Sequence, residues 1–448
     1  MVGEVSPAEV RRAPGGVSRR PRHPGCPRCP AVAAAGDTGG VSGSSSAASA
    51  ARTVAPWPGL SAGSLAGRAR APFGVYVHVP FCATRCGYCD FNTYTPGELG
   101  GRSGPREWLA ALCSELDLAA ATLGDPPPAA TVFVGGGTPS LLGASGLAAV
   151  LDAIRGSFGL AVGAEVTTEA NPESTSEDFF AGIRDAGYTR VSLGMQSAAP
   201  HVLRVLDREH TPGRAIEAVR EAHRAGFAHV NLDLIYGTPG ERPADLRDSL
   251  DVVLRAGVDH VSAYALTVED GTAMARRVRR GELATVDDDV LAADYELIDD
   301  TLSAAGLTWY EVSNWAASPE ARCAHNLGYW HDRDWWAAGP GAHGHVDGVR
   351  WWNVKHPARY VEMLAAGALP ADDGELLTDE DRRTERVMLR LRTAAGLPLE
   401  LLDGDGLGAA HQAAGDGLLD EEALRGGAAV LTRRGRLLAD GVVRRLLG

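Results

Sequence analysis

Short apolar runs alternate with segments of helical spacing along the chain from residue 73 onward. Runs rich in β-branched and aromatic residues indicate buried strands, and apolar residues three and four positions apart indicate helices packed on them. Six strands are expected, at 73–79, 131–134, 166–169, 191–194, 229–235 and 260–266. Helices are expected between them, at 105–122, 146–156, 177–186, 200–206, 212–225 and 243–256. Six such units predict an α/β fold, a partial (β/α)6 barrel with right-handed crossovers.

The regular alternation ends after the sixth unit, and we assign residues 71–310 to the barrel. Residues 311–375 mix helical stretches with an aromatic and glycine-rich tract. Residues 376–448 are predicted to form a smaller, mostly helical C-terminal domain. We expect this domain to end in a hairpin-like segment at 430–443, and it is a candidate winged-helix element.

The first 70 residues differ in composition from the rest of the chain. They are rich in Ala, Gly, Ser, Pro and Arg and carry few large aliphatic side chains. Such a segment lacks the apolar surface needed to form a core, so we predict a disordered extension. Its Arg-rich start weakly resembles a transit peptide but shows no clear amphipathic helix. Cys26 and Cys29 form a CxxC pair without a second half-site, which is insufficient to assign zinc.

Composition and charge exclude several classes of protein. The chain of 448 residues is 45% hydrophobic and 22% charged, which is typical of a globular protein. No apolar run is long enough to span a membrane. A formal net charge of −14 argues against nucleic-acid binding through a basic surface. Seven cysteines in a chain of this length make no disulfide framework, and we expect a reducing, cytoplasmic location.

The most informative chemistry is a C-x3-C-x2-C loop directly after the first strand, formed by Cys82, Cys86 and Cys89. Three thiolates are one ligand short of a structural zinc site. They can hold three irons of a 4Fe-4S cluster, which leaves the fourth iron open to a small molecule. The alternative is three buried cysteines that act as small hydrophobic residues.

Further polar residues fall at or near the ends of the following strands. The glycine-rich stretch 135–139 follows the second strand, where it allows a ligand to approach the backbone closely. Glu169 and Gln196 end the third and fourth strands, and Asp233 lies inside the apolar fifth strand. A buried carboxylate is costly unless it is paired or bound to a ligand. Arg208 suits a cofactor carboxylate, but a salt-bridge network of Glu169, Arg208 and Asp233 is equally consistent with the pattern.

Several motifs occur in one order across residues 73–345: Tyr-Val-His-Val-Pro-Phe-Cys, Gly-Gly-Gly-Thr-Pro-Ser, Glu-Ala-Asn-Pro-Glu, Arg-Val-Ser-Leu-Gly-Met-Gln, Asp-Leu-Ile-Tyr-Gly and Tyr-Glu-Val-Ser-Asn-Trp. In this order they resemble the oxygen-independent coproporphyrinogen III oxidase-like family of the radical S-adenosylmethionine (SAM) superfamily. The resemblance implies a 4Fe-4S cluster on Cys82, Cys86 and Cys89, with SAM on its open iron. It further implies that SAM is contacted by Tyr76, Gly136, Gly137, Thr138, Glu169, Gln196, Arg208 and Asp233.

Two features separate branches of that family. The oxidases carry a further cysteine two residues after the third, and Phe91 stands at that position here. The sequence from His325 to Trp330, His-Asn-Leu-Gly-Tyr-Trp, resembles the heme-binding signature of the heme chaperone (HemW-type) branch. His325 is the candidate heme ligand. Alternative heme ligands are Cys323 and, more weakly, His343 and His345.

The resemblance thus implies a protein that binds heme and passes it to acceptor hemoproteins, with an electron donor required if the cluster is reduced. The alternative is an enzyme of the same family, which would decarboxylate coproporphyrinogen III oxidatively to protoporphyrinogen IX. The sequence leaves open whether SAM is cleaved, and so whether the protein is an enzyme.

Overall fold

The computed structural model describes residues 60, 61, 63–99 and 103–448. Most of the predicted N-terminal extension, including Cys26 and Cys29, lies outside this range. The part of the predicted extension that the structure describes is packed against the rest of the chain. Leu65 is 1% exposed, and its backbone N–H donates to Thr122 O at 3.3 Å. Arg68 forms an ion pair with Asp347 at 3.0 Å. The predicted boundary at residue 70 is therefore too late.

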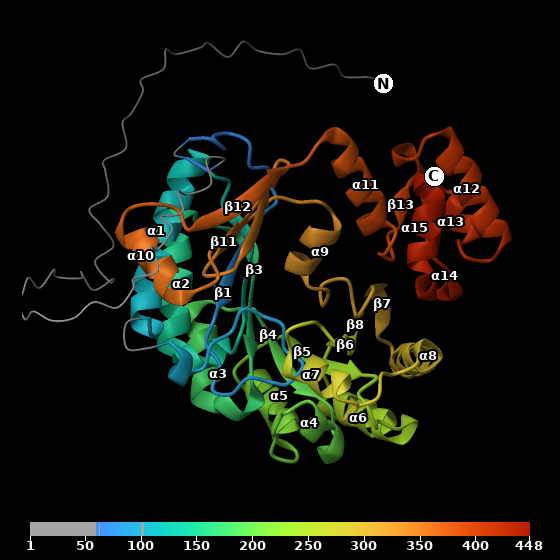
Figure 1. Cartoon of the computed structure of the whole chain (residues 1–448), viewed down its shortest axis with the longest axis horizontal. Coiled ribbons are helices and arrows are strands. Elements are labelled where there is room, and N and C mark those ends of the chain that lie inside the picture. The colour runs from blue at the N-terminus through green and yellow to red at the C-terminus, as the bar shows by residue number, and fades with distance from the viewer. Residues whose placement is uncertain (1–59, 62, 100–102) are drawn as a thin grey trace, which may run out of the picture. The chain divides into compact units, whose positions relative to one another are not determined.

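Six parallel strands form the centre of the fold, in chain order, as the sequence predicts (Figure 1). They are β1 (Phe73–Val79), β2 (Ala129–Gly136), β3 (Leu160–Ala170), β4 (Arg190–Gln196), β5 (His229–Tyr236) and β6 (His260–Ala265). The intervening helices are α1 (Pro105–Leu123), α2 (Gly143–Ser157), α3 (Glu177–Ala186), α4 (Pro200–Val205), α5 (Arg214–Arg224) and α6 (Pro243–Ala256). The predicted partial (β/α)6 barrel is confirmed.

Local sequence explains why these helices form where they do. In α3, the Ser176 side chain caps the N-terminus by accepting from Phe179 N at 3.2 Å. Phe179, Phe180 and Ile183 recur on one face and are buried in the main hydrophobic cluster. Gly187 ends the helix in the left-handed region at φ 107°.

The sheet extends beyond the six predicted strands, in the order β12-β11-β10-β9-β1-β2-β3-β4-β5-β6-β8-β7. The added strands are β7 (Thr308–Glu311), β8 (Asn314–Ala316), β9 (Trp335–Ala338), β10 (His343–Val346), β11 (Val349–Asn353) and β12 (Ala371–Leu376). β9 pairs parallel with β1, whereas the others pair antiparallel with their neighbours. The sequence analysis did not predict these strands, which have three to six residues each and lie in the aromatic and glycine-rich tract and its surroundings.

The other helices of this part are α7 (Ala273–Arg279), α8 (Asp288–Ala304), α9 (Ala324–Trp330) and α10 (Pro357–Ala365). α9 contacts β2, which places it against the barrel (Figure 1). None of the helices in the described ranges is long and apolar enough to cross a membrane.

The C-terminal part is mostly helical, as predicted, and has its own hydrophobic cluster. Its helices are α11 (Asp379–Arg390), α12 (Gly404–Gly415), α13 (Glu421–Arg425), α14 (Arg433–Leu437) and α15 (Ala439–Leu447). The hairpin predicted at 430–443 is wrong, because α14 and α15 occupy that segment. Thr432 caps α14, and Val442, Val443 and Leu446 are buried at helical spacing. The strand pair is instead β13 (Leu397–Pro398) with β14 (Ala428–Ala429).

Candidate functional site

The cysteine loop follows β1 at the carboxyl end of the parallel strands and is fixed by backbone hydrogen bonds. Cys82 N donates to Tyr94 O at 3.1 Å, which closes the loop on itself. Gly87 N donates to Leu206 O at 3.1 Å, which ties the loop to the segment after α4. Cys82, Cys86 and Cys89 all have free, partly exposed thiols. The loop therefore presents three sulfur atoms from one short, anchored segment.

Two predicted cofactor residues touch these sulfurs. The Thr138 hydroxyl donates to Cys82 Sγ at 3.7 Å, and Arg208 Nη1 donates to Cys86 Sγ at 3.6 Å. A Cβ at position 137 would lie 2.5 Å from Phe81 O and 3.0 Å from Cys82 Sγ, so only glycine fits beside the loop. The glycine-rich turn and the cysteine loop are thus packed together.

Three thiols from one short segment are the donor type that a 4Fe-4S cluster uses. No group of three or more His, Cys, Asp or Glu within the described ranges is arranged to hold one metal ion. Burial raises the pKa of Cys82, and it raises that of Cys89 to about 11. Iron binding would displace those thiol protons.

Behind the loop, two carboxylates face the barrel interior. Glu169 accepts from Gly136 N at 3.0 Å, and burial, reinforced by the nearby Asp233 carboxylate, raises the pKa of Glu169 to about 8. Asp233 accepts from Asn231 Nδ2 at 2.7 Å and from the Ser192 hydroxyl at 3.1 Å. Burial also raises the pKa of Asp233. Both carboxyl groups are desolvated, and a ligand with hydrogen-bond donors would stabilise their ionised forms.

Arg208 does not neutralise these carboxylates directly. Its Nη2 donates to Gly194 O at 3.1 Å, and its Nε donates to His210 Nε2 at 3.1 Å. No ion pair in the described part of the chain joins Arg208 to Glu169 or Asp233, so the alternative salt-bridge network does not form. Gln196 lies at the end of β4 with φ 67°, an uncommon conformation for a residue other than glycine. Such strain is frequent at ligand sites.

Tyr76 lies in the middle of β1, and its contacts extend both toward the cysteine loop and toward His325 on α9. Its hydroxyl hydrogen-bonds His78 Nδ1 at 3.0 Å, and His78 Nε2 hydrogen-bonds Asn92 O in the cysteine loop at 2.9 Å. On the other side, the Tyr76 ring stacks on Phe133 with centroids 6.3 Å apart. Phe133 in turn stacks on His325 at 5.4 Å. A continuous set of rings thus joins the cysteine loop to α9.

These groups line a cavity in the barrel. It encloses about 130 Å³ of accessible space. Its walls include Tyr76, Glu169 and Asp233 on the side of the cysteine loop and His260, Cys323 and His325 on the other side.

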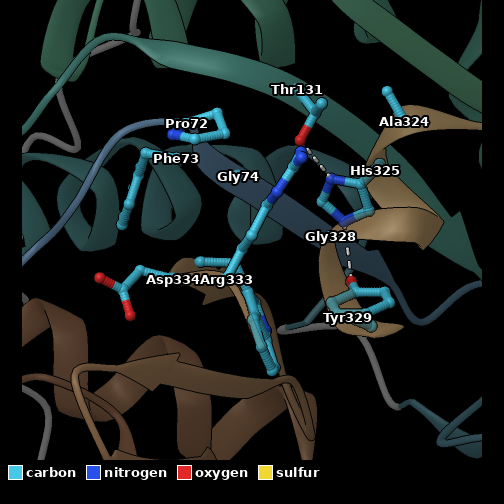
Figure 2. Close-up of a pocket in the computed structure, with 11 residues that line it drawn as sticks. Pro72, Phe73, Gly74, Thr131, Ala324, His325, Gly328, Tyr329, Arg333 and Asp334 are labelled. Carbon is cyan, nitrogen blue, oxygen red and sulfur yellow. Dashed lines mark hydrogen bonds between the residues drawn. The ribbon is translucent and has the colours of Figure 1, made fainter. Parts of the chain in front are cut away.

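The α9 helix closes the cavity at the amino ends of the strands. Glu165 on β3 accepts from Ala324 N and His325 N, both at 2.9 Å, which fixes the start of α9. His325 Nδ1 hydrogen-bonds the Thr131 hydroxyl at 2.9 Å, and its Nε2 hydrogen-bonds the Tyr329 hydroxyl at 2.7 Å (Figure 2). Gly74 permits this packing, since a Cβ there would lie 3.3 Å from the His325 ring.

His325 is therefore buried, at 3% exposure, with both ring nitrogens engaged. Burial lowers its pKa to about 3, so the imidazole is neutral. The alternative ligand Cys323 lies beside Glu165, with Sγ 3.6 Å from Oε1. His345 is also buried, and its Nε2 accepts from Gly348 N at 3.2 Å.

Sequence reasoning missed a second polar group in the cavity. His260 Nδ1 hydrogen-bonds Asn231 Oδ1 at 2.7 Å, and His260 Nε2 hydrogen-bonds the Tyr310 hydroxyl at 2.8 Å. Tyr310 lies on β7, which the sequence did not predict. Polar residues at alternate positions of β5 and β6 carry the missing signal, because they mark the strand faces that line the interior.

Comparisons with known proteins agree with this architecture. The family model of the radical SAM superfamily matches residues 76–253, a range that includes the cysteine loop. A protein named heme chaperone HemW from Mycobacterium tuberculosis (strain H37Rv) is 63% identical over 377 residues, which are 84% of this chain and 95% of the relative. One of the same name from Bacillus subtilis is 32% identical, covering 83% of this chain and 98% of the relative. The chain belongs to the HemW family.

A solved structure has a similar fold. It is the coproporphyrinogen III oxidase HemN from Escherichia coli, described as a radical SAM enzyme, with a TM-score of 0.71 and 24% sequence identity. The match covers 84% of this chain and 90% of that one. At this identity, the likeness concerns the fold alone.

Proposed function

We propose that this protein is a heme chaperone, which binds heme and passes it to acceptor hemoproteins in the cytoplasm. Membership in the HemW family carries this proposal, because the 63% identity extends over 95% of a relative with that name. The structure supports it by placing the heme-signature helix α9 at the amino ends of the strands, whereas the cysteine loop lies at the carboxyl ends. Cargo and cluster then occupy different ends of one barrel.

At the carboxyl ends, we propose that Cys82, Cys86 and Cys89 hold a 4Fe-4S cluster and that SAM binds beside it. Held by these three cysteines, such a cluster would supply an open coordination position for SAM. The residues proposed to contact SAM are Tyr76, Gly136, Gly137, Thr138, Glu169, Gln196, Arg208 and Asp233. Their support is the geometry around the loop: Thr138 and Arg208 already reach the sulfurs, and Glu169 and Asp233 are buried carboxylates that form no ion pair within the described residues.

Replacing Cys82, Cys86 and Cys89 together by Ala tests the cluster assignment. We expect anaerobically reconstituted protein to contain four irons and the triple variant to contain none. Four irons retained in the variant would point to other cysteines and contradict the assignment. An external electron donor is required only if the cluster is reduced during heme transfer.

At the amino ends, we propose His325 as a heme ligand. Neutral imidazole is an effective ligand of heme iron. In this structure Nε2 is held by the Tyr329 hydroxyl, so Tyr329 must move before His325 can bind iron. Tyr329 and Trp335 have rings 4.7 Å apart beside it, which supplies aromatic surface for a flat macrocycle.

A heme titration of His325→Ala, with Cys323→Ala as the matched control, tests this ligand. We expect His325→Ala to weaken heme binding or shift the Soret band while the 4Fe-4S absorbance stays unchanged, and Cys323→Ala to bind as the parent does. Equal heme binding by the parent and the His325 variant would exclude His325 as a ligand. We do not propose the oxidase reaction, since Phe91, 60% exposed, stands where the oxidases carry a further cysteine.

A further inference from the structure

A half-buried arginine lies across the pocket beside α9 without a partner. Figure 2 shows the Arg333 side chain extended through this pocket, which is also lined by Thr131, His325 and Tyr329. Among the described arginines that are at least partly buried, Arg333 is the one with no hydrogen bond, ion pair or ring contact from its side chain. A partly desolvated guanidinium without a counter-charge gains free energy when an anion pairs with it.

The charges around Arg333 strengthen the case for an anion. Arg390 on α11 donates to His331 O at 3.4 Å. Burial is the main cause that lowers the pKa of Arg390, and repulsion by the Arg333 charge lowers it further. Burial likewise lowers the pKa of Arg333. The adjacent carboxylate, Asp332, is already paired with Arg386 at 2.7 Å. The group formed by Arg333, Arg390, Arg386 and Asp332 therefore keeps an excess of positive charge.

The pocket also limits what the anion can be. The free space beside Arg333 is only about 10 Å³, room for about one water molecule, so a whole cofactor does not enter it and a carboxylate side arm enters only as the Arg333 side chain moves. Tyr329 and Trp335 provide rings at its wall, and the candidate iron ligand His325 lines it too. A flat, aromatic, iron-binding molecule that carries a carboxylate would match the small space, the aromatic wall and the candidate iron ligand together.

We propose that Arg333, with Arg390 beside it, binds a propionate carboxylate of heme. This inference rests on the proposed heme chaperone function and adds a specific contact to it. The guanidinium can donate two parallel hydrogen bonds to one carboxylate, which a lysine ammonium cannot. The contact would orient heme with its propionates toward α11, while its ring faces His325 and Tyr329.

The test compares heme with heme dimethyl ester, in which both propionates are esterified and uncharged. Each ligand is titrated into the full-length parent, Arg333→Gln, Arg333→Lys and the control Arg359→Gln. Arg359 is a half-exposed arginine on α10, paired with Glu362 at 3.5 Å. Thermal unfolding and 4Fe-4S content are measured for every variant to verify folding.

We expect Arg333→Gln to weaken heme binding by about tenfold and to change ester binding by less than about twofold. Arg333→Lys should show an intermediate loss for heme, and Arg359→Gln should show none. Equal effects of Arg333→Gln on both ligands, or no effect on either, would overturn the propionate assignment and leave the chaperone proposal intact. A parent protein that binds neither ligand would instead refute the chaperone proposal itself.

Discussion

Releasing His325 from Tyr329 should strengthen heme binding. In Tyr329→Phe the ring remains but the hydroxyl that hydrogen-bonds His325 Nε2 at 2.7 Å is lost. That bond must break before the imidazole can bind iron, and a net hydrogen bond of this kind is worth about 1 kcal/mol. The variant no longer has to break it, so the expected gain in heme affinity is about fivefold.

The same substitution should lower the stability of the heme-free protein. His325 Nε2 becomes a buried atom without a partner, which costs about 1–3 kcal/mol of unfolding free energy. Soret titration and chemical unfolding of the same preparation measure both effects. In a His325→Ala background, Tyr329→Phe should no longer change heme affinity, because there is no imidazole to release. Weaker heme binding by Tyr329→Phe in the parent background would refute this reasoning and assign iron ligation or direct heme contact to Tyr329.

Three further predictions concern the rest of the molecule. Asp233→Asn should weaken SAM binding by about tenfold or more, measured by calorimetry, while iron content is unchanged; unchanged affinity with lower stability would show a structural role only. Leu65→Ala should destabilise the protein by about 2–5 kcal/mol because Leu65 is 1% exposed in the main hydrophobic cluster, and a loss under about 0.5 kcal/mol in chemical unfolding would contradict that packing. Burial raises the pKa of Glu115 from 4.5 to about 7, so its contribution to stability should fall by about 3 kcal/mol as pH rises from about 4.5 to 7, while the unfolded state ionises first. Glu115→Gln should flatten that part of the stability profile, and an unchanged profile would refute the assignment.

Local motifs revealed the part of the site that lies within single loops. Cys82, Cys86 and Cys89 are close in sequence, and Gly137 follows the next strand, so the order of parallel strands sufficed to bring them together. The sequence also identified Asp233 because an acidic residue interrupts an apolar strand. These features follow from spacing and burial cost, which a sequence displays directly.

The surroundings of His325 could not be predicted in the same way. Its partner Thr131 is 194 positions away, and Glu165, which fixes the start of α9, is 160 positions away from it. Such pairs depend on how α9 enters the barrel, and that depends on β7–β12, whose short strands carry little periodic signal. Arg208 illustrates the same limit, since its contact with Cys86 Sγ joins two segments that only the folded chain brings together.

Transfer of heme to an acceptor is the most direct test of the proposed function. The heme-loaded protein is mixed with increasing concentrations of a heme-free hemoprotein under anaerobic conditions, and the Soret band of the acceptor is followed with time. We expect a transfer rate that rises with acceptor concentration, because heme passes within a complex of the two proteins. The same preparation, given SAM, a reductant and coproporphyrinogen III, should form no protoporphyrinogen IX. A transfer rate independent of acceptor concentration, which indicates simple dissociation of heme, or efficient formation of protoporphyrinogen IX would contradict the heme chaperone proposal.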